Sequence, residues 1–218
     1  TRLGNAISIS VREGGGITDP ESNFRLRLAI EMARANNMPK ENIQRAIDRA
    51  SGKGGEVNLS QVIYEGFAPY GVAVMVECIT DNKLRTQGQI KNYFEKNGGA
   101  MASSGAVSYL FSQGGEITLA KTSSLEEIFA LACDLGAQDV EEAEDAFDIY
   151  TSPSDVHKIK LGLEEKGWKV LSGQIIMKPI TFLTITEKDK TDKVINFLQN
   201  LEELDDVQKV YSNVEIVV

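Results

Sequence analysis

Eight cationic side chains near the start of this 218-residue chain are the residues whose type and spacing most clearly predict chemistry. A guanidinium group is planar and can donate two hydrogen bonds to one phosphate. Arg45 and Arg49 are four residues apart and lie opposite the apolar pair Ile43 and Ile47, so both project outward from one helix. The pattern predicts contact with a phosphate backbone. The candidates are Arg12, Arg25, Arg27, Arg34, Lys40, Arg45, Arg49 and Lys53.

An alternative interpretation gives these cations no ligand. Glu41 and Arg45 are spaced to form an ion pair on the helix surface, and the other cations would then be solvated. Residues 1–60 carry 9 Lys+Arg and 7 Asp+Glu, whereas residues 61–218 carry 14 and 25, which gives the net charge of −9. An acidic protein can still bind nucleic acid when one face concentrates its cations, so both interpretations stay open.

A second pair of cations lies in the segment Thr80–Thr86, at a predicted strand-to-helix turn. Lys83 and Arg85 could hold an anion there together with the free N–H groups of the helix. The alternative is a simple helix cap by Asp81 or Asn82. The two roles can coexist.

Catalytic motifs are not found in the sequence. The only histidine, His157, lies in a predicted helix without a triad or metal-site pattern around it. The acidic runs 141–145 and 202–206 are typical of solvated faces or turns, and Glu65 has no evident partner. We therefore expect that the protein is not an enzyme and that it has no catalytic residue, metal, cofactor or small-molecule substrate.

Glycine-rich segments at Gly14–Gly16 and Gly52–Gly55 match neither the P-loop nor the dinucleotide-binding pattern, and we expect flexible linkers. Three aromatic residues, Tyr64, Phe67 and Tyr70, could stack on bases if exposed. Packing within a sheet and its turn is the alternative for these rings.

Composition and cysteine usage indicate an intracellular globular protein. The chain is 42% hydrophobic and 25% charged, and no run approaches the ~18 apolar residues of a membrane span. Residues 1–10 lack a signal-peptide pattern. Cys78 and Cys133 lie in apolar patterns and are expected to be buried free thiols, which suits a reducing cytoplasm.

The elements that must position the cations are predicted to be three short helices in residues 1–50. Leu3, Ile7 and Val11 recur at helical spacing, and a second helix has Phe24, Leu28 and Met32 on one face. A third helix, with Pro39 in its first turn, turns Ile43, Ile47 and Ala50 inward. The chain opens in what reads as mid-helix without a methionine, so we expect that its native N-terminus is missing.

Strands and helices alternate from residue 62 onward. The pattern predicts strands at 62–64, 72–79 and 106–111, with a helix ending near Lys96. Residues 117–177 follow the order β-α-β-β-α-β of a ferredoxin-like unit. A strand, a helix and an extended segment complete the chain, either as their own domain or as a return to the domain that begins at residue 62.

Six segments together resemble the YebC/PmpR family of probable transcriptional regulators, which includes a mitochondrial translational activator of a cytochrome oxidase subunit. The resemblance covers essentially the whole chain in collinear order. The segments are NMPKENIQRAI (37–47), YEGFAPYGVA (64–73), TDNKLRT (80–86), NGG (97–99), GAVSYLF (105–111) and LDDVQKVYSN (204–213).

This resemblance implies three domains: a helical domain (1–55), a discontinuous α+β domain (60–112 plus 179–218) and an inserted ferredoxin-like domain (113–178). It implies a DNA-binding transcriptional regulator of the cytoplasm that contacts the nucleic-acid backbone through its helical domain. The alternative is a ribosome-associated translation factor that binds rRNA. Family members usually begin with a basic Gly-His-Ser-Lys-Trp segment, which this chain lacks, and we expect weaker binding without it.

Overall fold

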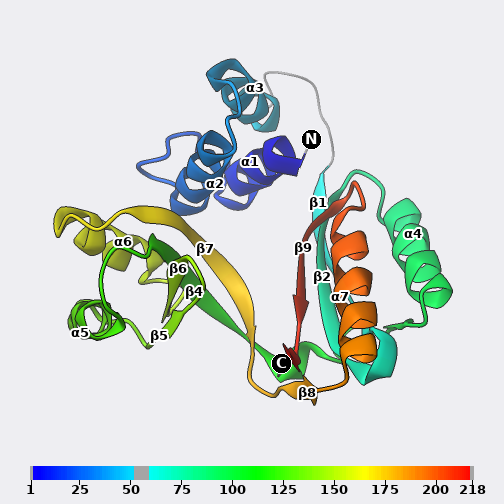
Figure 1. The fold of residues 1–218 in the computed structure, drawn as a ribbon. Coiled ribbons are helices and arrows are strands. Elements are labelled where there is room, and N and C mark those ends of the chain that lie inside the picture. Colours follow the sequence, from blue (N-terminus) through cyan, green and yellow to red (C-terminus); the bar gives the residue numbers. More distant parts are fainter. Residues whose placement is uncertain (1, 52–58, 217–218) are drawn as a thin grey trace. The chain divides into compact units, whose positions relative to one another are not determined.

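The computed structural model describes residues 2–51 and 59–216 (Figure 1). The chain divides into two compact units, unit 1 (Thr1–Ser112 with Pro179–Val218) and unit 2 (Gln113–Lys178). Mixed α and β structure with helices at the N-terminal end confirms the predicted fold class at this level. The finer division into three domains stays a prediction.

The described residues form seven α-helices, two 3-10 turns and ten strands. The helices are α1 (Arg2–Glu13), α2 (Phe24–Ala35), α3 (Lys40–Ala50), α4 (Lys83–Lys96), α5 (Leu125–Leu135), α6 (Val156–Glu165) and α7 (Lys188–Glu202), and the 3-10 turns are η1 (Pro69–Gly71) and η2 (Ser108–Leu110). The strands are β1 (Ser60–Phe67), β2 (Ala73–Thr80), β3 (Ala100–Ala102), β4 (Phe111–Ala120), β5 (Asp139–Glu142), β6 (Ala146–Thr151), β7 (Val170–Pro179), β8 (Leu183–Ile185), β9 (Val207–Ser212) and β10 (Val214–Ile216).

Helices α1, α2 and α3 share one apolar core. Ile7 and Val11 of α1 are fully buried, and Ile43 and Ile47 of α3 pack into the same cluster. The predicted face of α2 was wrong: Phe24, Leu28 and Met32 are only partly buried, whereas α2 buries Leu26, Ile30 and Ala33. The α2 sequence carries two apolar stripes of helical spacing, and packing against α1 selects the second.

The segment Gly14–Gly16 ends α1 and begins the connection to α2, and its backbone is held by hydrogen bonds. The Gly14 N–H donates to the Ser10 carbonyl and the Gly16 N–H to the Val11 carbonyl, which closes the helix. Gly15 and Gly16 adopt positive φ, and a Cβ at Gly14 would meet the Asn23 side chain. Gly52–Gly55 lie outside the described residues.

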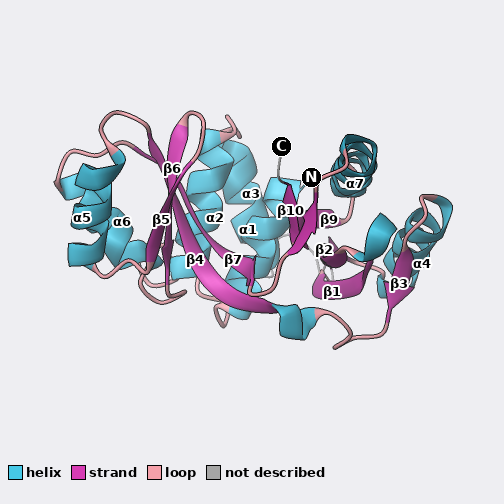
Figure 2. Ribbon diagram, turned by 60° about the horizontal axis from the view of Figure 1, so that its bottom comes forward, coloured by secondary structure: helices cyan, strands magenta, loops and turns pink. Residues whose placement is uncertain are grey.

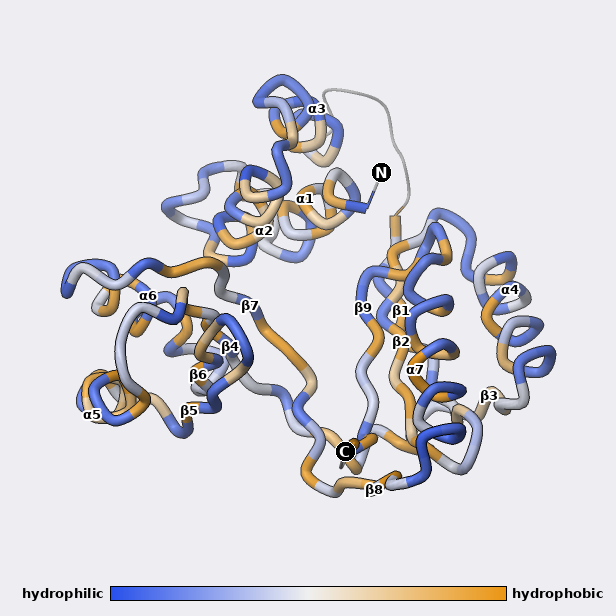
Figure 3. Tube along the Cα trace, viewed as in Figure 1, coloured by the Kyte–Doolittle hydropathy of each residue, from blue (hydrophilic) through white to orange (hydrophobic). Residues whose placement is uncertain are grey.

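Unit 1 contains a four-stranded antiparallel sheet in the order β3-β1-β2-β9. Helices α4 and α7 lie side by side against the same face of this sheet (Figure 1). Phe94 of α4 and Phe197 of α7 meet edge to face, with 5.1 Å between ring centroids. Strand β2 is hydrophobic along most of its length, as expected for a central strand (Figure 3). Strands β8 and β10 form a separate parallel pair.

Residues 106–111 were predicted to be a strand, and this prediction was wrong. The segment forms the turn η2, and strand β4 begins only at Phe111. The carboxylate of Glu65, only 5% exposed, accepts hydrogen bonds from the N–H groups of Gly105, Val107 and Ser108 at 2.7–2.9 Å. These donors are therefore not available to a sheet partner.

Unit 2 has the element order β-α-β-β-α-β and a four-stranded sheet in the order β5-β6-β4-β7. Helices α5 and α6 cover one side of this sheet (Figure 2), where Ile117, Ile128 and Ile149 are fully buried. The Ser124 hydroxyl accepts a hydrogen bond from the Glu127 N–H, and Gly136 ends α5 in the left-handed region.

Both cysteines are free thiols, as predicted, but only Cys78 is buried. Burial among apolar side chains, with Asp206 and Glu77 nearby, raises the pKa of Cys78 to about 12. Cys133 is exposed because α5 buries Ile128 and Ala132, and the following position turns about 100° away. None of the helices in the described residues combines the length and the hydrophobicity that a membrane span requires.

Candidate nucleic-acid interface

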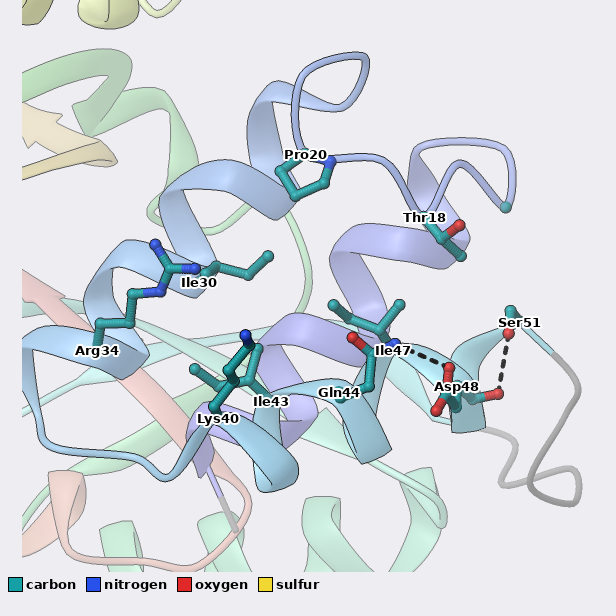
Figure 4. A pocket seen from close by; sticks show the side chains of 11 residues that line it. Thr18, Pro20, Ile30, Arg34, Lys40, Ile43, Gln44, Ile47, Asp48 and Ser51 are labelled. Carbon is teal, nitrogen blue, oxygen red and sulfur yellow. Dashed lines mark hydrogen bonds between the residues drawn. The ribbon is translucent and has the colours of Figure 1, made fainter.

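The predicted cations Arg34 and Lys40 converge on one groove of the helical bundle. Arg34 lies in the last turn of α2 and Lys40 is the first residue of α3, and both side chains are exposed. Neither forms an ion pair with any described residue. Figure 4 places the two at the same end of the groove, and Ile30, Ile43 and Ile47 form its apolar floor.

The groove has a volume of about 400 Å³ and a polar far end. Asp48 and Ser51 of the α3 C-terminal turns line that end (Figure 4). The Gln44 Nε2 donates to Asp48 Oδ1 at 3.0 Å, and the Ser51 hydroxyl donates to the Asp48 carbonyl at 3.0 Å. The groove is thus cationic at one end and carries one carboxylate at the other.

Helix stability does not account for a lysine at position 40. The N-terminal end of a helix bears partial positive charge, so a cation in the first turn is unfavourable there. Pro39, which precedes α3, provides no side-chain cap. The first N–H groups of α3 and the Lys40 ammonium together favour an anion at this end of the groove.

Arg45 and Arg49 project from a different side of α3, away from the groove. The Arg45 guanidinium donates to the Glu41 carbonyl at 3.3 Å and to Asn42 Oδ1 at 2.7 Å. The alternative ion pair between the Glu41 and Arg45 side chains is not among the ion pairs of the described residues. Arg49 is exposed and also lacks a carboxylate partner within the described ranges.

Three other predicted cations have structural partners. Arg25 pairs with Glu13, and Arg12 donates to the Leu59 carbonyl at 2.8 Å. Arg27 pairs with Glu21 at 3.0 Å and donates to the Pro20 carbonyl, and its side chain is only 18% exposed. The Arg25 and Arg27 contacts hold the loop before α2 and neutralise much of these two charges, whereas Arg12 is bonded to a neutral carbonyl just before β1. Lys53 lies outside the described residues.

The segment Thr80–Thr86 is organised around a helix cap, which was the alternative prediction for it. Asn82 Oδ1 accepts a hydrogen bond from the Arg85 N–H at the start of α4. The Arg85 guanidinium forms ion pairs with Asp81 at 2.9 Å and Asp206 at 3.0 Å, so its charge is already matched. Lys83 remains exposed, without a carboxylate partner among the described side chains.

Asp206 is a structural residue that the sequence did not identify, since residues 202–206 were predicted to be a solvated face or turn. Its Oδ2 accepts hydrogen bonds from Thr86 at 2.5 Å and Thr80 at 3.2 Å in addition to the ion pair with Arg85. Burial raises the pKa of Asp206, but these hydrogen bonds and the Arg85 charge lower it by more, so the net pKa lies below 3.8.

The three predicted aromatic residues divide between packing and exposure. Tyr64 is buried, and its hydroxyl donates to the Lys83 carbonyl at 3.0 Å, so it belongs to the core. Phe67 and Tyr70 are 37% and 44% exposed. The described residues contain no group of three or more histidine, cysteine or acidic side chains that could hold a metal ion.

Comparison with known proteins places this architecture in one family. The family model for the "TACO1/YebC second and third domain" matches residues 59–214, and that for the "TACO1/YebC protein N-terminal domain" matches residues 1–53. The chain belongs to the TACO1/YebC family, and the predicted resemblance is confirmed.

Similar proteins support the same assignment over the full length. The chain is 46% identical to a protein of Thermotoga maritima and 45% identical to one of Chloroflexus aurantiacus, each named "Probable transcriptional regulatory protein". These alignments cover 99% of this chain and 85–86% of the relatives. The crystal structure of a conserved hypothetical protein from Aquifex aeolicus has a TM-score of 0.92 at 44% identity, over 100% of this chain and 89% of that one.

Proposed function

We propose that this protein is a DNA-binding transcriptional regulatory protein that contacts the phosphate backbone through α2 and α3. The observation that carries the proposal is the convergence of Arg34 and Lys40, from two helices, on one groove. Both are exposed and lack an ion-pair partner in the described chain. The names of the relatives support a regulatory role, and no catalytic role is proposed.

A different side of α3 carries Arg45 and Arg49, which point away from the groove. They would contact a second phosphate run, while Lys83, Arg12 and the ion-paired Arg25, Arg27 and Arg85 contribute a weaker field. Backbone contacts of this kind position a protein on DNA and carry no sequence information directly. We therefore propose binding that tolerates sequence, unless another part of the chain reads bases.

The acidic residues lie mainly outside this surface. Unit 2 carries 13 Asp+Glu and 6 Lys+Arg, so it accounts for −7 of the net charge of −9. Repulsion from phosphate would keep unit 2 away from DNA and leave the helical bundle as the contact. We propose that unit 2 is the inserted ferredoxin-like domain and that the protein acts in the cytoplasm, where its two thiols stay reduced.

The experiment compares two charge-reversed pairs with a matched control. Fluorescence anisotropy of a labelled 30-base-pair duplex would be measured for wild type, Arg34→Glu with Lys40→Glu, and Arg45→Glu with Arg49→Glu. The control, Lys158→Glu with Lys169→Glu, makes the same charge change at exposed positions of unit 2. Both bundle variants are expected to lose affinity, whereas the control keeps most of it.

Parallel titration of purified ribosomes tests the other partner predicted from the sequence, rRNA in the ribosome. The proposal would be contradicted if wild-type protein binds ribosomes tightly and its affinity for duplex DNA is no higher than that of the bundle variants. Equal DNA affinity of all four proteins would show that the bundle is not the contact surface.

A further inference from the structure

The groove between α2 and α3 has an apolar floor as well as two cations. Ile30, Ile43 and Ile47 are buried in the bundle core, and their remaining surface lines the groove. A phosphate backbone makes charged and polar contacts, so it makes no use of such a floor. A volume of about 400 Å³ is typical of small-molecule sites, which combine apolar walls with a few polar groups. The groove therefore offers more than a phosphate contact uses.

The two ends of the groove are chemically opposite and lie along one side of α3. Lys40, Gln44 and Asp48 follow one another at four-residue spacing, so they share one face of the helix. Eight positions at the α-helical rise separate Lys40 from Asp48 by about 12 Å along the axis. Arg34 joins Lys40 at the cationic end (Figure 4). A ligand that spans the groove needs an anionic group at one end and hydrogen-bond donors at the other.

The Asp48 carboxylate is able to accept hydrogen bonds from a ligand. It is half-buried, and no cation of the described residues forms an ion pair with it. The Gln44 Nε2 donates to its Oδ1 at 3.0 Å and so orients the group, while no side chain in the described ranges donates to Oδ2. An ionised carboxylate accepts about four hydrogen bonds and can take two parallel N–H donors at once. The far end of the groove thus suits a flat group with two adjacent donors.

We propose that the groove binds a free guanine mononucleotide, with the phosphate at Arg34 and Lys40 and the base on the apolar floor. Guanine carries its N1–H and its amino N–H₂ side by side on one edge, and these two donors match the Asp48 carboxylate. Adenine, cytosine and uracil each place an acceptor on the corresponding edge, which a carboxylate repels. A free amino acid carries its opposite charges too close together to reach both ends.

This inference rests on the proposed function at the phosphate end only, where a nucleotide and duplex DNA would compete for the same two cations. Guanine in a duplex does not occupy the far end, because cytosine accepts the same two donors. The nucleotide is a regulatory ligand and not a substrate: it displaces DNA from the groove, and no bond is made or broken.

Isothermal titration calorimetry with three nucleotides of equal phosphate charge tests the assignment of the base. Guanosine monophosphate is expected to bind wild type at least about tenfold more tightly than inosine or adenosine monophosphate, because inosine lacks the amino donor and adenine presents an acceptor. Arg34→Glu with Lys40→Glu should weaken guanosine monophosphate by at least about tenfold, since it replaces both phosphate contacts with negative charge.

Asp48→Asn tests the carboxylate directly. Xanthine has a carbonyl where guanine has the amino group, and an asparagine amide donates to a carbonyl. The variant should bind guanosine monophosphate at least about tenfold more weakly than wild type and xanthosine monophosphate more tightly than wild type. The gain for xanthosine also shows that the variant is folded. Asp134→Asn, an exposed change in unit 2, should keep the wild-type order of affinities.

Equal affinity of wild type for the three nucleotides would overturn the inference. Tighter binding of guanosine monophosphate by Asp48→Asn would do the same, because the carboxylate would then act only through its charge, and so would unchanged binding by Arg34→Glu with Lys40→Glu. Failure of the DNA contact looks different: guanosine monophosphate would bind with its preference intact but would not displace the labelled 30-base-pair duplex.

Discussion

Arg85 and Asp206 lie 121 positions apart in the sequence and form an ion pair with 3.0 Å between Nη2 and Oδ2. The pair joins the segment Thr80–Thr86 at the start of α4 to the turn before β9. Both segments are among those that carry the family resemblance. Their residues are therefore explained by the assembly of unit 1, and a ligand is not needed to account for them.

We predict that Asp206→Asn destabilises the protein in a pH-dependent way. Because the folded pKa lies below 3.8, the carboxylate stabilises the fold above that pH, and this contribution is lost as the pH falls through the folded pKa. At pH 7 the variant should lose about 1.5–3 kcal/mol, the range for hydrogen bonds to a charged group. Urea unfolding at pH 7, 5 and 3 checks this, and the difference from wild type should shrink only below about pH 4.

Asp205→Asn is the matched control for this experiment. Asp205 is the exposed neighbour of Asp206. Its substitution makes the same chemical change but leaves the contacts of Asp206 in place. Its unfolding free energy should stay close to that of wild type. Equal loss in the two variants would contradict a special role for Asp206.

We predict that Glu65→Gln loosens the loop that carries Tyr109. An amide presents an N–H₂ group where the carboxylate now accepts three N–H donors, and each donor left unsatisfied costs about 1–3 kcal/mol. Burial raises the pKa of Glu65, but the backbone hydrogen bonds lower it by more, so the net pKa lies below the ordinary value of 4.5. The carboxylate is therefore ionised at neutral pH and accepts the three hydrogen bonds in the wild-type protein. Hydrogen exchange of residues 105–108 measures the effect.

Glu95→Gln serves as the control because, among the described residues, the Glu95 carboxylate forms only an exposed ion pair with Lys91. Exchange at residues 105–108 should not change in this variant. Unaltered exchange in Glu65→Gln as well would show that the carboxylate does not hold the loop.

Local pattern was sufficient to predict much of the fold. Helical spacing located α1, and Ser124 with Glu127 located the start of α5, because both signals act within a few residues. The face of α2 was not predictable, since two stripes of equal spacing compete and only packing decides. A strand does not form at 106–111 because the carboxylate of Glu65, some forty positions earlier, accepts hydrogen bonds from the N–H groups of this segment.

The candidate site was predicted only as a set of residue types. The sequence identified Arg34 and Lys40 as cations but could not place them at one groove, because their convergence depends on the turn between α2 and α3. It could not separate them from Arg25 and Arg27, whose carboxylate partners are fixed by tertiary contacts. The folded loop before α2 decides which of these charges meet a carboxylate, and residue type alone does not.

We predict that Asp48→Asn strengthens DNA binding. Asp48 is the carboxylate at the far end of the groove, and its Oδ1 accepts from Gln44, a bond that asparagine can keep. Removing one negative charge from a groove that holds phosphate should tighten binding about two- to fivefold at low salt. Anisotropy with the 30-base-pair duplex measures it. Asp134→Asn, an exposed change in unit 2, should leave the affinity unchanged.

The measurement that tests the central claim most directly is the salt dependence of duplex binding by wild type and by Arg34→Glu with Lys40→Glu. A cation that contacts phosphate releases counterions, so each lost contact reduces the slope of log K against log salt by about 0.9. We predict a slope that is shallower by about 2 in the variant and unchanged in Lys158→Glu with Lys169→Glu. Superimposable lines for wild type and the groove variant would contradict the assignment of the groove as the phosphate contact.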